Sequence, residues 1–114
     1  MDVRLDIEPI PNGLILRVCA SRVDAAAALA FRDACRQATA KTEGARVILD
    51  MEDVTFLDSS GLGTLVAIRK SLGQDRQLEL TSLSPLVDKV LRLTAMDKVF
   101  AIHPNKTAAL NQSA

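Results

Sequence analysis

Two neighbouring serines, Ser59 and Ser60, stand where an apolar run gives way to a helical pattern, in the stretch VTFLDSSGLGTLVAIRKSLG. A hydroxyl at the beginning of a helix either caps the unpaired N–H groups there or accepts a phosphate, because the positive end of the helix dipole stabilises negative charge. Two serines are more than a cap requires. Gly61 and Gly63 allow a tight turn and keep bulk away from the hydroxyls, and Asp58 would orient a hydroxyl or form an acidic docking contact. These residues alone leave both interpretations open.

The same stretch does not fit the common catalytic motifs. It lacks the GxxxxGK[ST] spacing of a nucleotide-binding loop, and it is not GxSxG, with the single histidine, His103, far away in the sequence. Asp50 or Asp53 would be the acceptor if this were a phosphoaspartate receiver domain, but the opening hairpin ends in Pro9 and Pro11 rather than in an acidic pair. We therefore expect no enzyme activity, no cofactor and no metal site.

Composition narrows the class of protein. The 114 residues suit one domain, residues 1–114, and 48% hydrophobic with 25% charged residues is typical of a globular protein. Fourteen basic residues balance fourteen acidic ones, which argues against a direct contact with nucleic acid. No apolar run reaches the ~18 residues that a membrane span needs, and the charged beginning of the chain is unlike a signal peptide. We expect a cytoplasmic protein with no membrane insertion.

Hydrophobic periodicity predicts an α/β fold. The alternating residues at the start predict a hairpin of two strands, and the almost wholly apolar run 46–50 is typical of a central strand. Asp24 is a suitable N-cap for the first helix. After the hairpin, strands and helices alternate, which predicts crossover connections and a mixed, mostly parallel sheet packed with about four helices. The expected strands are 2–8, 14–20, 46–50, 77–83 and 98–102, and the expected helices are 24–42, 61–73, 85–93 and a short one after 105.

The run VILDMEDVTFLDSSGLGTLVAIRKSLG resembles the signature of the STAS domain, in its anti-sigma factor antagonist branch. The resemblance covers nearly the whole chain and implies a STAS-type single domain. By position, Ser59 corresponds to the serine that a cognate anti-sigma kinase phosphorylates in this family. Ser60 corresponds to the adjacent serine that shapes the turn. The family's acidic residue at its first helix corresponds to Asp24, although Ser21 replaces the glycine that usually opens that stretch. The implied partner-binding residues are Asp24, Asp58, Ser60, Gly61, Leu62 and Gly63.

The resemblance implies a partner-switching protein. Without phosphate, it would bind an ATP-using anti-sigma factor/serine kinase and so release a sigma factor. Phosphorylation of Ser59 would dissociate the complex, a PP2C-like phosphatase would reset it, and the free protein would be a monomer. The alternative is a STAS subunit of a transport, lipid-trafficking or stress-sensing complex, in which the same surface is a constitutive contact.

Overall fold

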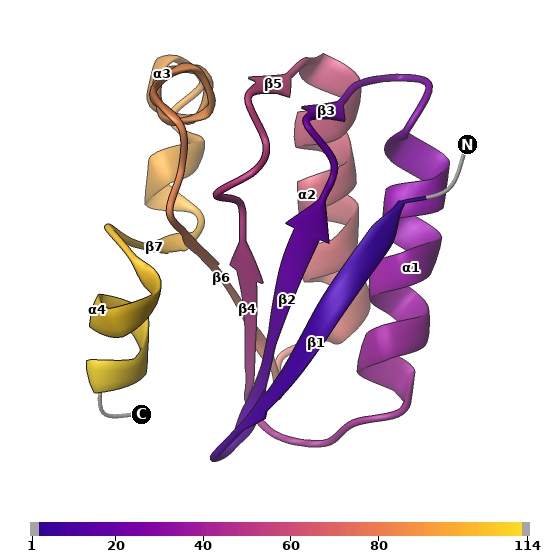
Figure 1. The fold of residues 1–114 in the computed structure, drawn as a ribbon, viewed down its shortest axis with the longest axis vertical. Coiled ribbons are helices and arrows are strands. Elements are labelled where there is room, and N and C mark those ends of the chain that lie inside the picture. Colours follow the sequence, from indigo (N-terminus) through magenta and orange to yellow (C-terminus); the bar gives the residue numbers. More distant parts are fainter. Residues whose placement is uncertain (1–2, 113–114) are drawn as a thin grey trace.

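Seven strands, four α-helices and one 3₁₀-helix form over residues 3–112, the part of the chain that this computed structural model describes (Figure 1). In chain order they are β1 Arg4–Ile10, β2 Gly13–Cys19, β3 Arg22–Val23, α1 Ala28–Ala40, β4 Arg46–Asp50, β5 Phe56–Leu57, α2 Ser59–Leu72, β6 Gln77–Thr81, α3 Pro85–Leu93, η1 Met96–Lys98, β7 Ala101–His103 and α4 Lys106–Asn111.

A five-stranded sheet in the order β1-β2-β4-β6-β7 forms the centre of the fold. Only β1 and β2 are antiparallel; the other neighbouring strands are parallel. The predicted opening hairpin and mixed, mostly parallel sheet are therefore confirmed. All five residues of β4 are buried, which confirms that the apolar run 46–50 is a central strand.

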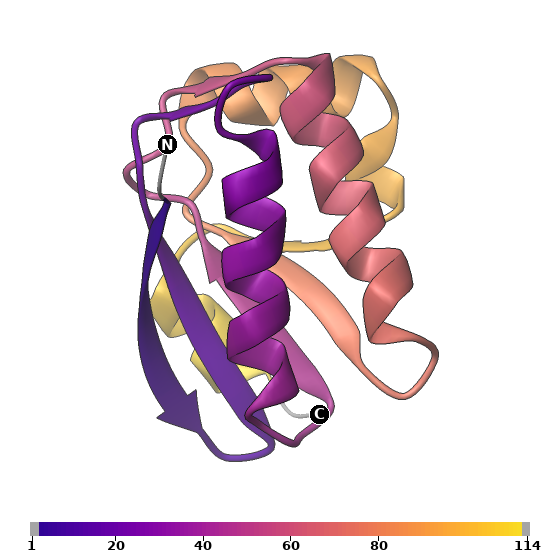
Figure 2. The same ribbon diagram turned by 90° about the vertical axis from the view of Figure 1, so that its right-hand side faces the viewer.

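Helices cover the two faces of this sheet unequally. Helices α1 and α2 lie side by side on one face, and the main core fills the space between them and the strands (Figure 2). On the other face, α4 covers a smaller cluster of Ile15, Ile48 and Ala109 (Figure 1). Within residues 3–112, no helix is long and apolar enough to cross a membrane. The larger core fixes α2, whose beginning carries the candidate site.

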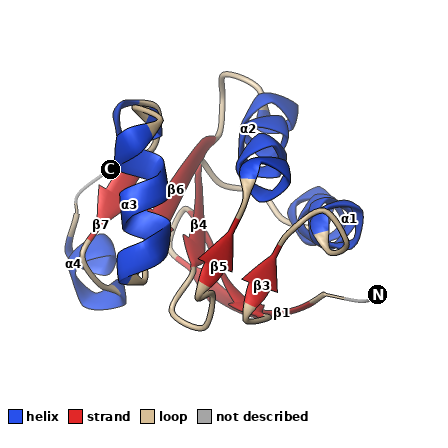
Figure 3. Cartoon of the chain, turned by 90° about the horizontal axis from the view of Figure 1, so that it is seen from above, coloured by secondary structure: helices blue, strands red, loops and turns tan. Residues whose placement is uncertain are grey.

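Two short strands beyond the carboxyl ends of β2 and β4 were not predicted. Strands β3 and β5 pair in parallel as a separate small sheet (Figure 3). Each has only two residues, so neither has enough length to show the alternation by which strands are recognised. Their pairing holds the segment before α1 beside the segment before α2.

The ends of several elements differ from the expected ones. Helix α1 begins at Ala28 rather than at Asp24, because residues 25–27 form a turn before it. Helix α2 begins two residues earlier than expected, at Ser59. The expected strand 98–102 is only Ala101–His103, since the chain first makes the short helix η1.

A buried ion pair links the central strands. The Arg46 guanidinium donates to both Glu79 carboxylate oxygens, at 2.8 and 2.7 Å, and Nε2 of His103 lies 2.7 Å from the same carboxylate. Arg46 also donates to the main-chain carbonyl of Ala109, at 2.9 Å, which fastens α4 to the sheet. The Arg46 and Glu79 side chains are only 10% and 5% exposed, so each charge depends mainly on the other for its hydrogen bonds.

Candidate functional site at the beginning of α2

Ser59 and Ser60 are the first two residues of α2, and both are exposed. Neither side-chain hydroxyl makes a hydrogen bond to any residue between 3 and 112, whereas the Ser60 main-chain carbonyl accepts one from Thr64 Oγ1, at 2.9 Å. The main-chain N–H groups of the first helical turn and the positive end of the dipole lie at this position. The Ser59 hydroxyl is thus open to another molecule, in a place that tolerates added negative charge.

The helix cap is Asp58, and not either serine. Asp58 has extended backbone angles, and its Oδ1 accepts a hydrogen bond from the Gly61 N–H at 3.0 Å. This is the contact by which an N-cap side chain satisfies a free donor of the first turn. The interpretation of the serines as caps is therefore wrong, and the Asp58 carboxylate bonds to the main chain instead of orienting a serine hydroxyl.

The two possible roles of Asp58, cap and docking charge, are separable by mutation. Asp58→Asn keeps a capping oxygen and removes the charge, so the free energy of unfolding should change by less than about 0.5 kcal/mol, whereas Asp58→Ala should lower it by about 1 kcal/mol. Chemical denaturation of both variants measures this difference. Equal stability of the two variants would show that the Gly61 bond contributes nothing.

The two glycines of the site face opposite ways. A Cβ on Gly61 would lie 2.2 Å from the Val23 carbonyl oxygen and 2.5 Å from Leu57 Cδ1, so the first turn of α2 packs directly on the backbone of β3. A Cβ on Gly63 would meet nothing within 4 Å, and Gly63 is exposed. Gly61 is thus required by the fold, while Gly63 leaves the outer surface of the first turn flat.

Asp24 directly follows β3, and β3 lies at the same end of the molecule as the beginning of α2 (Figure 1). Its carboxylate accepts hydrogen bonds from Arg22 Nε, at 3.3 Å, and from the Ala27 N–H, at 3.2 Å. Partial burial raises the pKa of Asp24, but these bonds outweigh it, so the pKa lies below its ordinary value and the group is ionised. The fold therefore brings Asp24 to the same end as the serines, as a structural charge in the turn before α1.

Arg22 and Phe56 form a contact in the two short strands that precede the first two helices, and sequence reasoning missed both. The Arg22 guanidinium carbon lies 4.0 Å from the centre of the Phe56 ring, an arrangement in which the ring face attracts the cation. The two residues become neighbours only through the pairing of β3 with β5. No local pattern in the sequence signals that pairing.

Leu62, the remaining predicted contact residue, is half-buried and packs against the main core. The surface around the beginning of α2 therefore combines exposed Ser59, Ser60 and Gly63 with supporting residues that fix their positions. We call this the α2 surface; it consists of Asp24, Asp58, Ser59, Ser60, Gly61, Leu62 and Gly63.

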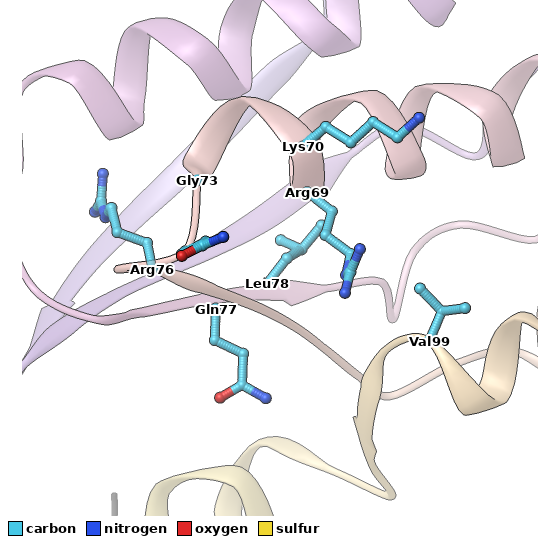
Figure 4. A pocket seen from close by; sticks show the side chains of 8 residues that line it. Arg69, Lys70, Gly73, Arg76, Gln77, Leu78 and Val99 are labelled. Carbon is cyan, nitrogen blue, oxygen red and sulfur yellow. The ribbon is translucent and has the colours of Figure 1, made fainter.

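A cleft of about 570 Å³ lies at the opposite end of α2 and is lined by residues such as Arg69, Gly73, Gln77 and Val99 (Figure 4). Its lining includes no residue of the α2 surface. No three metal-binding side chains cluster anywhere in the described residues. Because none of its residues lines this cleft or the smaller pockets among the described residues, the α2 surface suits contact with another protein better than enclosure of a small molecule.

Comparison with known proteins gives one family. The family model for the STAS domain matches residues 4–109. A STAS-domain containing protein of Pseudomonas aeruginosa is 34% identical over 82 residues, covering 71% of this chain and 79% of its own. An anti-sigma F factor antagonist of Paenibacillus polymyxa is 23% identical over 113 residues, covering 98% of this chain and 96% of its own. The crystal structure of an anti-sigma factor antagonist from Mycobacterium paratuberculosis superposes with a TM-score of 0.83, at 25% identity, over 96% of this chain and 92% of that one. The chain belongs to the STAS domain family.

Proposed function

We propose that this chain is an anti-sigma factor antagonist that binds its anti-sigma factor through the α2 surface and is released by phosphorylation of Ser59. The observation that carries the proposal is the Ser59 hydroxyl, which is exposed, makes no hydrogen bond within the described residues and stands on the first residue of α2. The relatives named anti-sigma factor antagonists, which match this chain over nearly its whole length, support the choice of partner.

The switch would work through charge. A phosphate adds about −1.5 to −2 charge to an interface that had accepted a neutral hydroxyl. Burying that charge against a partner costs desolvation, and its repulsion by Asp58 of the same chain becomes stronger where the interface excludes water. In the free protein, the N–H groups of the first turn and the helix dipole stabilise the same charge by about 0.3–1 kcal/mol. The complex is thus weakened and the free form is not, so no rearrangement of the fold is needed.

The nucleotide in this scheme belongs to the partner. The proposed anti-sigma factor is a serine kinase that uses ATP, a PP2C-like phosphatase removes the phosphate, and this cytoplasmic chain is a binding module rather than an enzyme. Asp24, Ser60, Leu62 and Gly63 would contact or shape the interface, while Asp58 and Gly61 hold Ser59 in position.

A single mixture tests the proposal: this protein, ATP and the anti-sigma kinase of the same organism, followed by intact mass and site mapping. We expect one added phosphate, on Ser59, and none on Ser59→Ala. Ser59→Asp should bind the unphosphorylated partner at least about tenfold more weakly, a loss of about 1.4 kcal/mol. Ser60→Ala is the matched control, because it removes the neighbouring exposed hydroxyl and should still be labelled.

Two results would contradict the proposal. Labelling of Ser59→Ala to the wild-type level would place the phosphate on another residue. Equal binding of wild type, Ser59→Ala and Ser59→Asp to the anti-sigma factor would mean that the α2 surface is a constitutive contact or is not the interface.

A further inference from the structure

The outer edge of the sheet is open at β1. This strand has β2 on one side and no neighbouring strand on the other among the described residues (Figure 1). All seven of its residues except Leu5 and Ile10 are exposed, including Ile7 at 51%. An exposed strand edge is a ready site for another strand to pair with. It lies apart from the α2 surface, because α1 packs on β1 whereas α2 packs on β6.

The ladder between β1, β2 and β4 shows which backbone groups of β1 are free. The Arg46 N–H donates to the Asn12 carbonyl, so the even-numbered residues of the second strand direct their main-chain groups toward β4 and the odd-numbered ones toward β1. Because Gly13 lies opposite Ile10, the even-numbered residues of β1 bond to β2. The odd-numbered residues, Leu5 and Ile7 in the middle, direct their N–H and C=O groups outward.

Pro9 agrees with this assignment. A proline has no N–H, and within sheets it is found where that N–H would face away from the ladder. Pro9 lies opposite Leu14 and is odd-numbered, so its nitrogen is on the open side. The β1–β2 ladder therefore loses no bond to it.

The sequence of β1 is complementary to itself when a second copy runs antiparallel to it. With Asp6 opposite Asp6, Leu5 faces Ile7 of the second copy and Arg4 faces Glu8 of the second copy, each contact occurring twice. Leu5 and Ile7, whose main-chain groups point outward, become the hydrogen-bonded pair. Arg4 and Glu8 form the alternate pair, in which side chains come closer together. Backbone direction, apolar pairing and charge pairing thus select the same register over residues 4–8. Pro9 lies opposite Val3 of the second copy and, without an N–H, ends the ladder there.

We propose that β1 pairs with β1 of a second copy of this chain about a two-fold axis at Asp6, joining two five-stranded sheets into one. The Arg4 and Glu8 side chains are 76% and 49% exposed and pair within the chain with Asp6 and Lys106, so the contact exchanges two solvent-exposed ion pairs for pairs between the copies. The two Asp6 carboxylates that meet at the axis are partly neutralised within each copy, by Arg4 at 3.6 Å and Arg17 at 3.9 Å.

Helix α1 presents several small side chains beside the open edge. A shallow groove of about 530 Å³ runs between α1 and the start of β1, and Ala30 and Ala34 are part of its lining. Small side chains at this place let a neighbouring helix approach closely. Leu29, which is 64% exposed and lines the same groove, adds apolar area at the rim. This pairing goes beyond the proposed switch and departs from the monomer that the family resemblance implies.

Charge-reversed variants test the register. Arg4→Glu gives an edge with like negative charges at the two paired positions, and Glu8→Arg gives one with like positive charges. Each variant alone should dimerise at least about tenfold more weakly than wild type, because both cross-strand pairs become repulsive. An equimolar mixture of the two variants should restore the dimer, since every cross pair is again between opposite charges. Sedimentation equilibrium over a concentration series measures all four samples, with thermal unfolding to confirm that each variant is folded.

Each other outcome overturns the inference. Wild type that stays monomeric up to about 1 mM excludes a pairing of useful strength. A dimer that is insensitive to both reversals uses another surface, and failure of the mixture to pair, with both variants folded, excludes the Arg4–Glu8 register. None of these results bears on Ser59 labelling, so the proposed switch is tested separately.

Discussion

Glu79→Leu should lower the free energy of unfolding by about 3–5 kcal/mol, because it leaves the buried Arg46 charge without its partner. The two side chains share a pair of hydrogen bonds of 2.8 and 2.7 Å and are almost inaccessible to water. A buried cation retains its desolvation cost after the carboxylate is removed. Denaturation by urea, monitored by circular dichroism, measures the loss.

The double variant Arg46→Met/Glu79→Leu should recover at least half of that loss, since no unpaired charge stays in the sheet. The remainder reflects the Ala109 carbonyl, which loses the donor that Arg46 supplies. Asp88→Ala is a suitable control, because it breaks an exposed ion pair to Arg92 that should contribute less than about 1 kcal/mol. A double variant that is as unstable as the single one would show that packing, and not charge, causes the effect.

The Arg46–Glu79 pair should also make the stability of the wild type depend on pH. Burial raises the pKa of Glu79, but the bonds from Arg46 and His103 outweigh it, so the folded-state pKa lies below the ordinary value of 4.5. Stability from this group is therefore fully present above pH 4.5 and is lost as the pH falls from there through the lower, folded-state pKa. In Arg46→Met/Glu79→Leu, this part of the acid sensitivity should be absent.

Gly61→Ala should lower the free energy of unfolding by about 3 kcal/mol, the upper end of the range for overfilled sites. The new methyl group would lie 2.2 Å from a backbone oxygen, the Val23 carbonyl, which cannot rotate away as a side chain does. Relief requires α2 and β3 to separate, which would also stretch the cap between Asp58 and the first turn. Thermal and chemical unfolding give the change in stability.

Gly63→Ala is the matched control, two positions further along the same helix. Nothing lies within 4 Å of the added methyl group, and alanine is the better helix former, so this variant should be more stable than wild type by about 0.5–1 kcal/mol. If Gly61→Ala were as well tolerated as Gly63→Ala, the contact between α2 and the β3 backbone would not be a constraint.

Long periodic segments made the fold predictable. The mostly apolar run of β4 indicates a strand that is buried on both faces, and the apolar stripe of α3 indicates a helix that is buried on one face. The expected bounds of both elements are confirmed. The strands β3 and β5 were not predictable because pairing between two-residue segments depends on tertiary contacts. The beginning of α1 was placed too early because four alanines follow Asp24, and such a run suits a turn and a helix equally.

At the candidate site, the sequence indicated which residues lie close together but not which structural role each one has. Ser59, Asp58 and Gly61 are neighbours in the chain, so their proximity was certain in advance. The choice of cap depended on a difference of two residues in where α2 begins, which periodicity does not resolve. The packing of Gly61 on Val23 depended on a contact between segments far apart in the sequence.

The position of Ser59 inside the first turn has a consequence for any enzyme that modifies it. An active site that takes its substrate as an extended segment could reach this residue only after unwinding the start of α2 and separating Gly61 from the Val23 backbone. The modifying enzyme must therefore recognise the folded start of α2. A short synthetic peptide with this sequence would lack most of the structure that such an enzyme binds.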